Sequence, residues 1–350
     1  MKRIEGNCKA LFFTGIAGFL SVMAGICKKV RTDRPHRSRK ARKARRAGSY
    51  LAVLIFSLAI IIAGVSSCAS HVPVPVPVSD QVSGGSSVWL VTGDGVSMFL
   101  GGSIHILRDS DFPLPEEYDL AFSQSKALVL ETDVSQMEQP EIVQYLMSRM
   151  VLSDGRTLQS LLDSDVYKML AAKLKEYGLP IEAVMDFKPS MVINMLAVMQ
   201  LQKFGFMQEG LDFYYAAKAN GANMPVRFLE SVQTQIDTLV SMGEGYENDF
   251  VLYSLQDMED TEKLLDVIIS DWKAGEAAST EMALNSMKET WPLIYKSLIT
   301  DRHDAWMPQI KEYLHSGSTY FVIAGLAHMH GPDGLLRMLG DLGYTVKQFR

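Results

Sequence analysis

Cysteine is scarce in this 350-residue chain, and its three positions, Cys8, Cys27 and Cys68, all fall within the first 68 residues. No disulfide can therefore form within residues 69–350. A thiolate nucleophile and a cysteine-rich zinc site are excluded there for the same reason. Histidine, aspartate and glutamate are then the side chains available for metal binding or acid–base chemistry.

An excess of positive charge is also missing from the larger part of the chain. Residues 69–350 contain 20 Lys and Arg against 38 Asp and Glu, whereas residues 1–50 contain 14 basic and 2 acidic residues. Nucleic-acid binding depends on basic side chains that neutralise phosphates, so no nucleic-acid partner is expected for residues 69–350. With 47% hydrophobic and 21% charged residues, a disordered chain and a polytopic membrane protein are excluded as well.

The basic residues at the start of the chain precede an uncharged apolar stretch. Residues 50–65 read YLAVLIFSLAIIIAGV and follow the cationic run at 37–46, which is the order found in a secretory signal. The sequence VSSC at 65–68 resembles a bacterial lipobox. We therefore predict that Cys68 is lipidated and holds the protein at a membrane of the bacterial cell envelope. A signal anchor with an incidental cysteine is the alternative.

Composition divides the chain into three parts. After Cys68 the sequence HVPVPVPV gives way to a segment rich in serine and glycine, which is typical of a linker. We predict a basic leader and signal at 1–67, a lipidated cysteine with its linker at 68–87, and one domain at 88–350. A domain of this size can bury a single large core.

Sequence patterns within the domain predict an α/β fold. Residues 88–92 and 96–101 are expected strands joined by Gly93-Asp94-Gly95, a strong hairpin signal. Further strands are expected at 126–133, 224–230, 318–325 and 345–349. Helical patterns cover 116–125, 140–150, 157–177, 182–204, 211–220, 231–242, 246–274 and 280–315. The expected architecture is a mixed central sheet opened by a β-hairpin, with a large helical insertion at about 137–315.

Two G-x-x-H sequences stand at the ends of expected strands. Gly102-Ser103-Ile104-His105 follows the hairpin, and Gly325-Leu326-Ala327-His328 ends the strand at 318–325. Because α/β sheets bind their ligands at the carboxyl ends of strands, we expect His105 and His328 to converge in the fold. Either sequence alone carries little weight, since a lone histidine is more often a hydrogen-bonded core residue.

Two glutamates, Glu131 and Glu230, end apolar strands in a similar way. A buried carboxylate without a partner is costly. One interpretation is a metal ligand or general base, and the other is a salt bridge to a residue such as Arg302. Asp133 is expected to share the side of Glu131 if the strand continues that far.

These residues carry a resemblance to the TraB/GumN family, which is related to the Tiki proteases. The likeness extends over essentially all of residues 88–350. It comprises GSIHILRDSDFPLPEEYDLAFSQSKALVLETDV at 102–134, Lys188-Pro189, Gly210-Leu211-Asp212, Leu229-Glu230, Gln235, Asp301-Arg302-His303, Trp306, Ile310 and FVIAGLAHMHGPDGLLRMLGDLGYTV at 321–346.

The resemblance implies a metal-dependent protease in which His105, His328 and Glu131 bind Mn, Co or Zn. Glu230 would be a further ligand or the base that takes a proton from the bound water. Arg302 would stabilise an oxyanion or a substrate carboxylate. Where relatives commonly carry asparagine after the arginine, this chain has His303, which adds another imidazole to the candidate ligands.

The expected function is therefore that of a lipid-anchored metal-dependent hydrolase acting on a peptide or protein substrate in the cell envelope. The related erythromycin-esterase branch hydrolyses without an evident metal, so histidine-based hydrolysis without a metal is a second hypothesis. A third is a non-catalytic lipoprotein that binds a peptide or haem. A close cluster of His105, His328, Glu131 and Glu230 with an open coordination position favours catalysis, whereas side chains spread around an apolar cavity favour binding.

Overall fold

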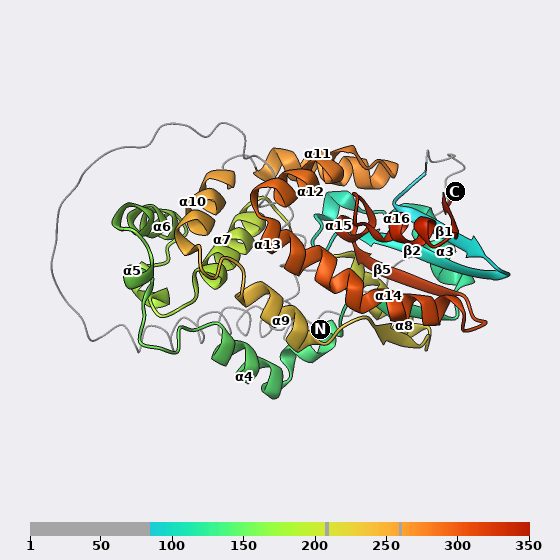
Figure 1. The fold of residues 1–350 in the computed structure, drawn as a ribbon, viewed down its shortest axis with the longest axis horizontal. Helices are drawn as coiled ribbons and strands as arrows, with labels where there is room; N and C mark the ends of the chain where they lie inside the picture. Colours follow the sequence, from blue (N-terminus) through green and yellow to red (C-terminus); the bar gives the residue numbers. More distant parts are fainter. Residues whose placement is uncertain (1–84, 207–209, 259–260) are drawn as a thin grey trace, which may run out of the picture.

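A six-stranded mixed sheet organises one end of the molecule (Figure 1). The computed structural model describes residues 85–206, 210–258 and 261–350. The strand order is β4-β3-β5-β2-β1-β6. The strands are β1 (Val88–Gly93), β2 (Val96–Ser103), β3 (Ala127–Leu130), β4 (Val226–Phe228), β5 (Tyr320–Gly325) and β6 (Thr345–Gln348). Strands β4, β3, β5 and β2 run parallel, and β1 is antiparallel to both β2 and β6. The predicted α/β class with a mixed sheet is confirmed.

The hairpin at the start of the domain forms as the sequence predicts. Strands β1 and β2 pair in a register that places Gly93 opposite Val96. The two residues between them, Asp94 and Gly95, have φ angles of 51° and 78°. Positive φ at both positions is what a type I′ hairpin turn requires, and the twist of this turn matches that of the strands.

Helices surround the sheet and build the opposite end of the molecule (Figure 1). Those near the sheet are α3 (Glu116–Gln124), α8 (Leu211–Gly221), α14 (Asp301–Leu314), α15 (Leu326–Met329) and α16 (Leu335–Asp341). The others are α4 (Pro140–Arg149), α5 (Leu158–Leu161), α6 (Ser164–Glu176), α7 (Pro189–Lys203), α9 (Val232–Val240), α10 (Glu247–Asp257), α11 (Thr261–Ala274), α12 (Ala278–Thr290) and α13 (Pro292–Tyr295). Of these, α11 also reaches the sheet, where Nε1 of Trp272 donates to the carbonyl oxygen of Gly102 in β2 at 2.7 Å. Short 3₁₀ turns are η3 (Asp109–Asp111), η4 (Val134–Glu138) and η5 (Ile181–Val184), and η6 (Lys296–Thr300) is a π-helical turn.

Several long helical patterns are shorter or interrupted in the structure. The pattern at 280–315 divides into α12, α13, η6 and α14, and those at 157–177 and 246–274 each divide in two. Proline explains two of these differences: Pro292 opens α13, and Pro189 opens α7, which therefore begins later than the expected residue 182. Proline lacks the backbone N–H that a helix interior needs, so it suits the first helical turn.

Strand β3 is also shorter than the expected 126–133, and it ends at Leu130. The backbone carbonyl of Glu131 turns to accept the N–H of Glu230 at 2.9 Å. Asp133 then caps η4, where its Oδ1 accepts the N–H of Ser135 at 3.1 Å. The strand does not persist to Asp133, so the condition for it to share the side of Glu131 is not met.

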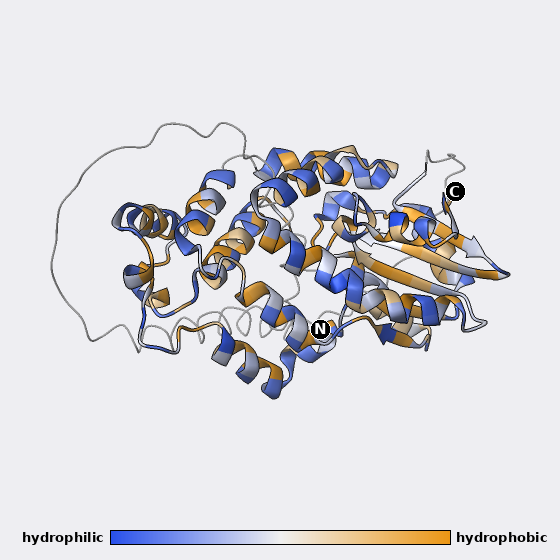
Figure 2. Cartoon of the chain, in the orientation of Figure 1, coloured by the Kyte–Doolittle hydropathy of each residue, from blue (hydrophilic) through white to orange (hydrophobic). Residues whose placement is uncertain are grey.

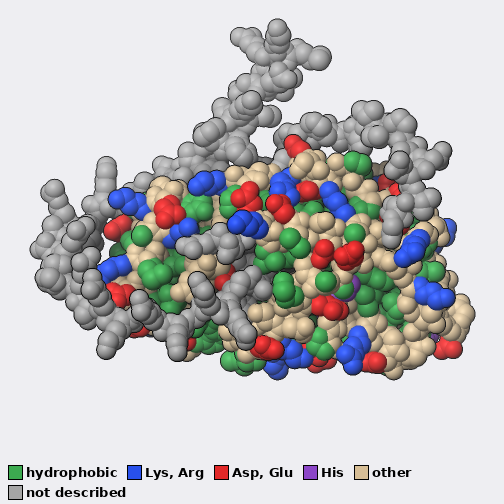
Figure 3. Space-filling view, turned by 90° about the horizontal axis from the view of Figure 1, so that it is seen from above, with side chains coloured by type: hydrophobic (Ala, Val, Ile, Leu, Met, Phe, Trp, Pro, Cys, Tyr) green, Lys and Arg blue, Asp and Glu red, His purple; other side chains and the backbone are tan. Residues whose placement is uncertain are grey.

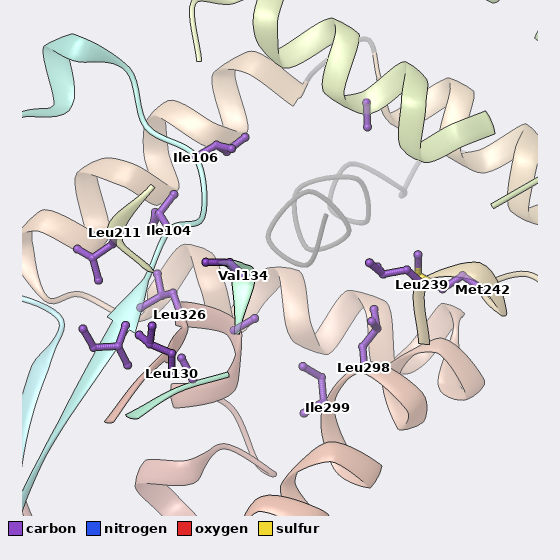
Figure 4. Close-up of a cluster of buried hydrophobic side chains, with 14 of the residues drawn as sticks. Ile104, Ile106, Leu130, Val134, Leu211, Leu239, Met242, Leu298, Ile299 and Leu326 are labelled. Atoms are coloured by element: carbon purple, nitrogen blue, oxygen red, sulfur yellow. The ribbon is translucent and has the colours of Figure 1, made fainter. Parts of the chain in front are cut away.

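Apolar side chains form one core that joins the sheet to the helical end. Figure 2 shows the strands as mainly apolar, while the helices alternate apolar and polar faces. Figure 4 shows a part of this core that comes from both sides: Ile104, Ile106, Leu130, Leu211 and Leu326 from the sheet side, and Leu239, Met242, Leu298 and Ile299 from the helical side. Ile104, Ile106 and Leu130 are sequence neighbours of the predicted site residues His105 and Glu131. The predicted site residues therefore have apolar surroundings.

Positive and negative side chains are interspersed on the face of the molecule in Figure 3 rather than gathered by sign. Within the described ranges, no helix is both long enough and apolar enough to cross a membrane. The predicted signal, Cys68 and most of the predicted linker fall on residues 1–84, outside the described residues.

Candidate functional site

The carboxyl ends of four parallel strands bring the candidate residues to one edge of the sheet. His105 follows β2, Glu131 directly follows β3, Glu230 follows β4, and His328 lies in α15 just after β5. Nε2 of His105 lies 3.8 Å from Oε1 of Glu131, and Nε2 of His328 lies 3.7 Å from the same oxygen. The two G-x-x-H histidines and the strand-end glutamates therefore occupy one cluster, in which His105, His328 and Glu131 are buried and the side chain of Glu230 is 6% exposed.

Arg302, from the first turn of α14, connects this cluster. Its Nε and Nη2 donate to the two carboxylate oxygens of Glu230 at 3.0 and 2.8 Å, and Nη2 also donates to Oε2 of Glu131. Its Nη1 donates to Nε2 of His328 at 2.8 Å. Four of the five N–H groups of the guanidinium are thus used. The salt bridge considered above as the alternative for the glutamates is present, and it includes both of them.

The two carboxylates respond differently to this environment. Burial acts to raise the pKa of Glu131, but Arg302, the two imidazoles and the N–H of Gly325, which donates at 2.6 Å, hold that pKa well below its ordinary value. Burial raises the pKa of Glu230 above its ordinary value in spite of Arg302. Glu131 is therefore a firmly ionised anchor for the guanidinium and a poor proton acceptor.

A hydrogen-bonded chain leads from Arg302 through two histidines. A guanidinium has no acceptor, so Nε2 of His328 accepts and its Nδ1 carries the proton. Nδ1 of His328 then donates to Nε2 of His303 at 2.9 Å, and Nδ1 of His303 donates to the carbonyl oxygen of Asp333 at 2.7 Å. Burial lowers the pKa of His303 to about 4 and that of His328 well below its ordinary value, so both are neutral at pH 7.

His105 has a different partner, the buried carboxylate of Asp212 in the first turn of α8. Nδ1 of His105 donates to Oδ2 of Asp212 at 2.6 Å. This bond directs Nε2, with its lone pair, toward the side of Glu131. Burial alone would lower the pKa of His105, but Asp212 and then Glu131 outweigh it, and the pKa is raised above 6.5.

Gly210 permits this pairing, because it lies against the backbone of His105. A Cβ at Gly210 would stand 2.1 Å from the carbonyl carbon and oxygen of His105. We expect Gly210→Ala to separate α8 from the strand end and to destabilise the protein by about 2–4 kcal/mol, the range of severe steric substitutions. Gly221→Ala, on the same helix and with open space around its Cβ, is the matched control. Urea unfolding of both variants measures the effect, and equal stability would contradict it.

Two further side chains complete the cluster. Nε2 of Gln235 donates to Oε2 of Glu131 at 3.3 Å, and Nε1 of Trp306 donates to Oε2 of Glu230 at 3.1 Å. Sequence reasoning assigned no role to either residue, or to Asp212. The available signal was their place in the family resemblance, and for Asp212 its position beside a glycine at a helix start.

The donor arrangement does not fit the expected divalent metal ion. The residue types are suitable, with two imidazoles and a carboxylate. However, Arg302 donates to the His328 nitrogen whose lone pair a metal would need, and it also binds Glu131. Nε2 of His303 accepts from His328 and its Nδ1 donates to the carbonyl oxygen of Asp333, so both of its ring nitrogens are already used. Within the described ranges, no group of three or more His, Asp or Glu side chains is arranged to hold a metal ion.

Comparison with known proteins gives the family but no characterised relative. The chain is 25% identical over 244 residues to "Uncharacterized protein YbaP" of Escherichia coli (strain K12), which covers 68% of this chain and 86% of that protein. The protein of the same name from Shigella flexneri matches to the same extent. No solved structure matches the chain. The model of the TraB/PrgY/gumN family matches residues 87–348, so this chain belongs to the TraB/PrgY/gumN family.

Proposed function

We propose that this protein is a peptidase-like hydrolase whose general base is His105. The observation that carries the proposal is the 2.6 Å hydrogen bond from His105 Nδ1 to the buried carboxylate of Asp212. A carboxylate bound to Nδ1 fixes the orientation of the imidazole ring and keeps the ring proton on Nδ1. The other nitrogen, Nε2, then points in a fixed direction with its lone pair available. Family membership alone does not decide activity, so the proposal depends on this geometry.

His105 has the properties that proton transfer from water requires. Its neutral form has a lone pair on Nε2, and Asp212 raises the pKa of the ring above its ordinary value against the effect of burial, which strengthens it as a proton acceptor. Nε2 would take a proton from water as the water attacks a carbonyl carbon, and would return it to the leaving amine. The cluster is buried and bordered by apolar side chains, which strengthens electrostatic interactions within it.

Arg302 would bind the negative charge that develops on the carbonyl oxygen. One N–H of Nη1 has no acceptor within the described part of the chain, whereas the other four are used. The two carboxylates hold the guanidinium in one orientation, so little reorganisation is needed when charge develops. Glu131 and Glu230 are then positioning residues for Arg302.

His105, His328, Glu131 and Glu230 lie close together rather than around an apolar cavity, which argues against non-catalytic binding of a peptide or haem. Arg302 stands where an open coordination position would be, so the proposal is hydrolysis without a metal. We further propose that the domain works outside the cytoplasm, anchored at a cell-envelope membrane through lipidated Cys68, on a peptide or protein of that compartment. The apolar stretch at 50–65 and the lipobox-like sequence that ends in Cys68 support this location.

The test is a search for cleavage with a diverse peptide library, using the purified full-length chain in detergent and mass spectrometry of the products. We expect cleavage by the wild type and a loss of at least about 100-fold in His105→Gln. His315→Gln is the matched control, since His315 is exposed at the end of α14.

Two outcomes of this search count against the proposal. One is the absence of any product with the folded wild-type chain, which favours the binding hypothesis. The other is equal cleavage by the wild type and the His105 variant. A parallel assay with a metal chelator separates the roles of base and metal. Cleavage should continue in the chelator, because the proposed base, His105, needs no metal ion.

A further inference from the structure

Two imidazole nitrogens in the site lie within 4 Å of one carboxylate oxygen. Nε2 of His105 and Nε2 of His328 are 3.8 and 3.7 Å from Oε1 of Glu131. Two donors bound to a tetrahedral zinc or cobalt ion at about 2.0–2.1 Å are about 3.4 Å apart. A shift of a few tenths of an ångström would bring both nitrogens to that separation from the oxygen.

Gly325 leaves space beside these three side chains. A Cβ at this position would lie 3.2 Å from both Glu131 Oε1 and His105 Nε2, and 3.5 Å from Cδ2 of His328. All three side chains therefore border one point next to the Gly325 backbone.

Arg302 nevertheless engages two of the three donors. Its Nη1 donates to Nε2 of His328 at 2.8 Å, and its Nη2 donates to the carboxylate of Glu131. A guanidinium cannot be deprotonated in a protein, so it cannot give up its charge when a metal ion approaches. The guanidinium of Arg302 is also buried, and it makes two hydrogen bonds to Glu230.

We propose that Arg302 is the resident cation of this site and keeps His105, His328 and Glu131 from binding a divalent metal. The chain thus contains a closed His–His–Glu metal site, which opens when the guanidinium is removed. This inference concerns the same residues as the proposed hydrolysis but does not depend on it, because metal binding is measured without a substrate.

A charge-balanced double variant, Arg302→Met with Glu230→Gln, opens the site while leaving all three donors in place. Glu230 is bonded by Arg302 and by Trp306 in the described part of the chain, so its neutralisation removes the carboxylate that would otherwise stay unpaired. If this variant does not fold, Arg302→Met with Glu230→Met replaces it, since an apolar pair often substitutes for a buried ion pair without loss of stability.

The experiment is a titration of the purified full-length chain with Co²⁺, read as visible absorption, as cobalt retained after gel filtration and as a shift in melting temperature. We expect the wild type to retain no stoichiometric cobalt. The double variant should retain about one ion per chain and gain thermal stability from it. Adding His105→Ala or His328→Ala should abolish both effects, whereas His315→Ala should not.

Either of two results would overturn the inference. The first is stoichiometric cobalt binding by the wild type that is lost in His105→Ala and His328→Ala, since Arg302 would then not exclude the metal. The second is a double variant that is folded by circular dichroism and retains no cobalt, since the three donors would then not form a site. Neither result depends on whether the chain cleaves peptides, which the library search measures separately.

Discussion

Replacing Asp212 by asparagine is expected to lower the rate of peptide cleavage by about 10²–10⁴-fold, the range that general base catalysis contributes. Asparagine keeps the shape of the side chain but removes the negative charge beside Nδ1 of His105. The imidazolium formed during the reaction then loses its nearest counter-charge. The amide can also donate to Nδ1, which would place the ring proton on Nε2, where the lone pair is needed.

The same substitution should move the pH dependence of cleavage in a defined direction. His105 acts as a base only when neutral, and its pKa in the folded wild type is raised above 6.5 by Asp212. Wild-type activity should therefore rise as the pH increases through that raised value. Asp212 is the largest influence that raises this pKa, and its loss leaves only Glu131 against burial and Arg302, so the acid limb of kcat/KM should shift to lower pH in Asp212→Asn.

The measurement is kcat/KM from about pH 5 to about pH 9, the range in which histidine titrates. Asp249→Asn is the matched control, because Asp249 is exposed and lies in the first turn of α10, as Asp212 does in α8. An acid limb at the same pH in the wild type and Asp212→Asn would show that the titrating base is another group. An NMR titration of the His105 ring gives the same pKa without a substrate.

The strand-end residues could be predicted from sequence because their position follows from the sheet alone. An apolar strand followed by a polar side chain places that side chain at the carboxyl edge, and parallel neighbours share that edge. His105, His328, Glu131 and Glu230 were found in this way. The expectation for Asp133 depended on the strand continuing that far, and the pattern does not say where a strand stops; β3 stops at Leu130.

The sequence offered the salt bridge between Arg302 and the strand-end glutamates only as one of two alternatives, and it gave no sign of the contact between Asp212 and His105. Both contacts depend on how helices lie against the sheet. The pattern at 280–315 suggested one helix, but the structure has a π-helical turn at η6 directly before α14. A π turn holds an additional residue and changes the face that the following residues present. The direction of Arg302 therefore depends on an irregularity that helical periodicity does not reveal. Asp212 similarly reaches His105 from 107 residues along the chain.

Glu131→Gln is expected to destabilise the protein by about 3–5 kcal/mol at pH 7, the cost of removing one partner from a buried ion pair. Oε1 of Glu131 accepts the N–H of Gly325, and Oε2 accepts from Arg302 and Gln235. In glutamine an NH₂ group replaces one of these two oxygens. That NH₂ group would face either the N–H of Gly325 or the N–H groups of Arg302 and Gln235, and two donors cannot form a hydrogen bond. Arg302 would keep Glu230 as its only carboxylate partner within the described residues.

The size of this effect should depend on pH, because the pKa of Glu131 is lowered in the folded state from an ordinary value of 4.5. A carboxylate with a lowered pKa stabilises the fold fully above its unfolded value, and that contribution is lost as the pH falls through the folded value. The stability of the wild type should therefore approach that of Glu131→Gln as the pH is lowered below about 4.5. Urea unfolding at neutral and acidic pH measures this difference. Glu138→Gln is the matched control, since Glu138 is exposed at the end of η4. A difference that stays constant from neutral to acidic pH would mean that steric fit, rather than the charge of Glu131, holds Arg302 in place.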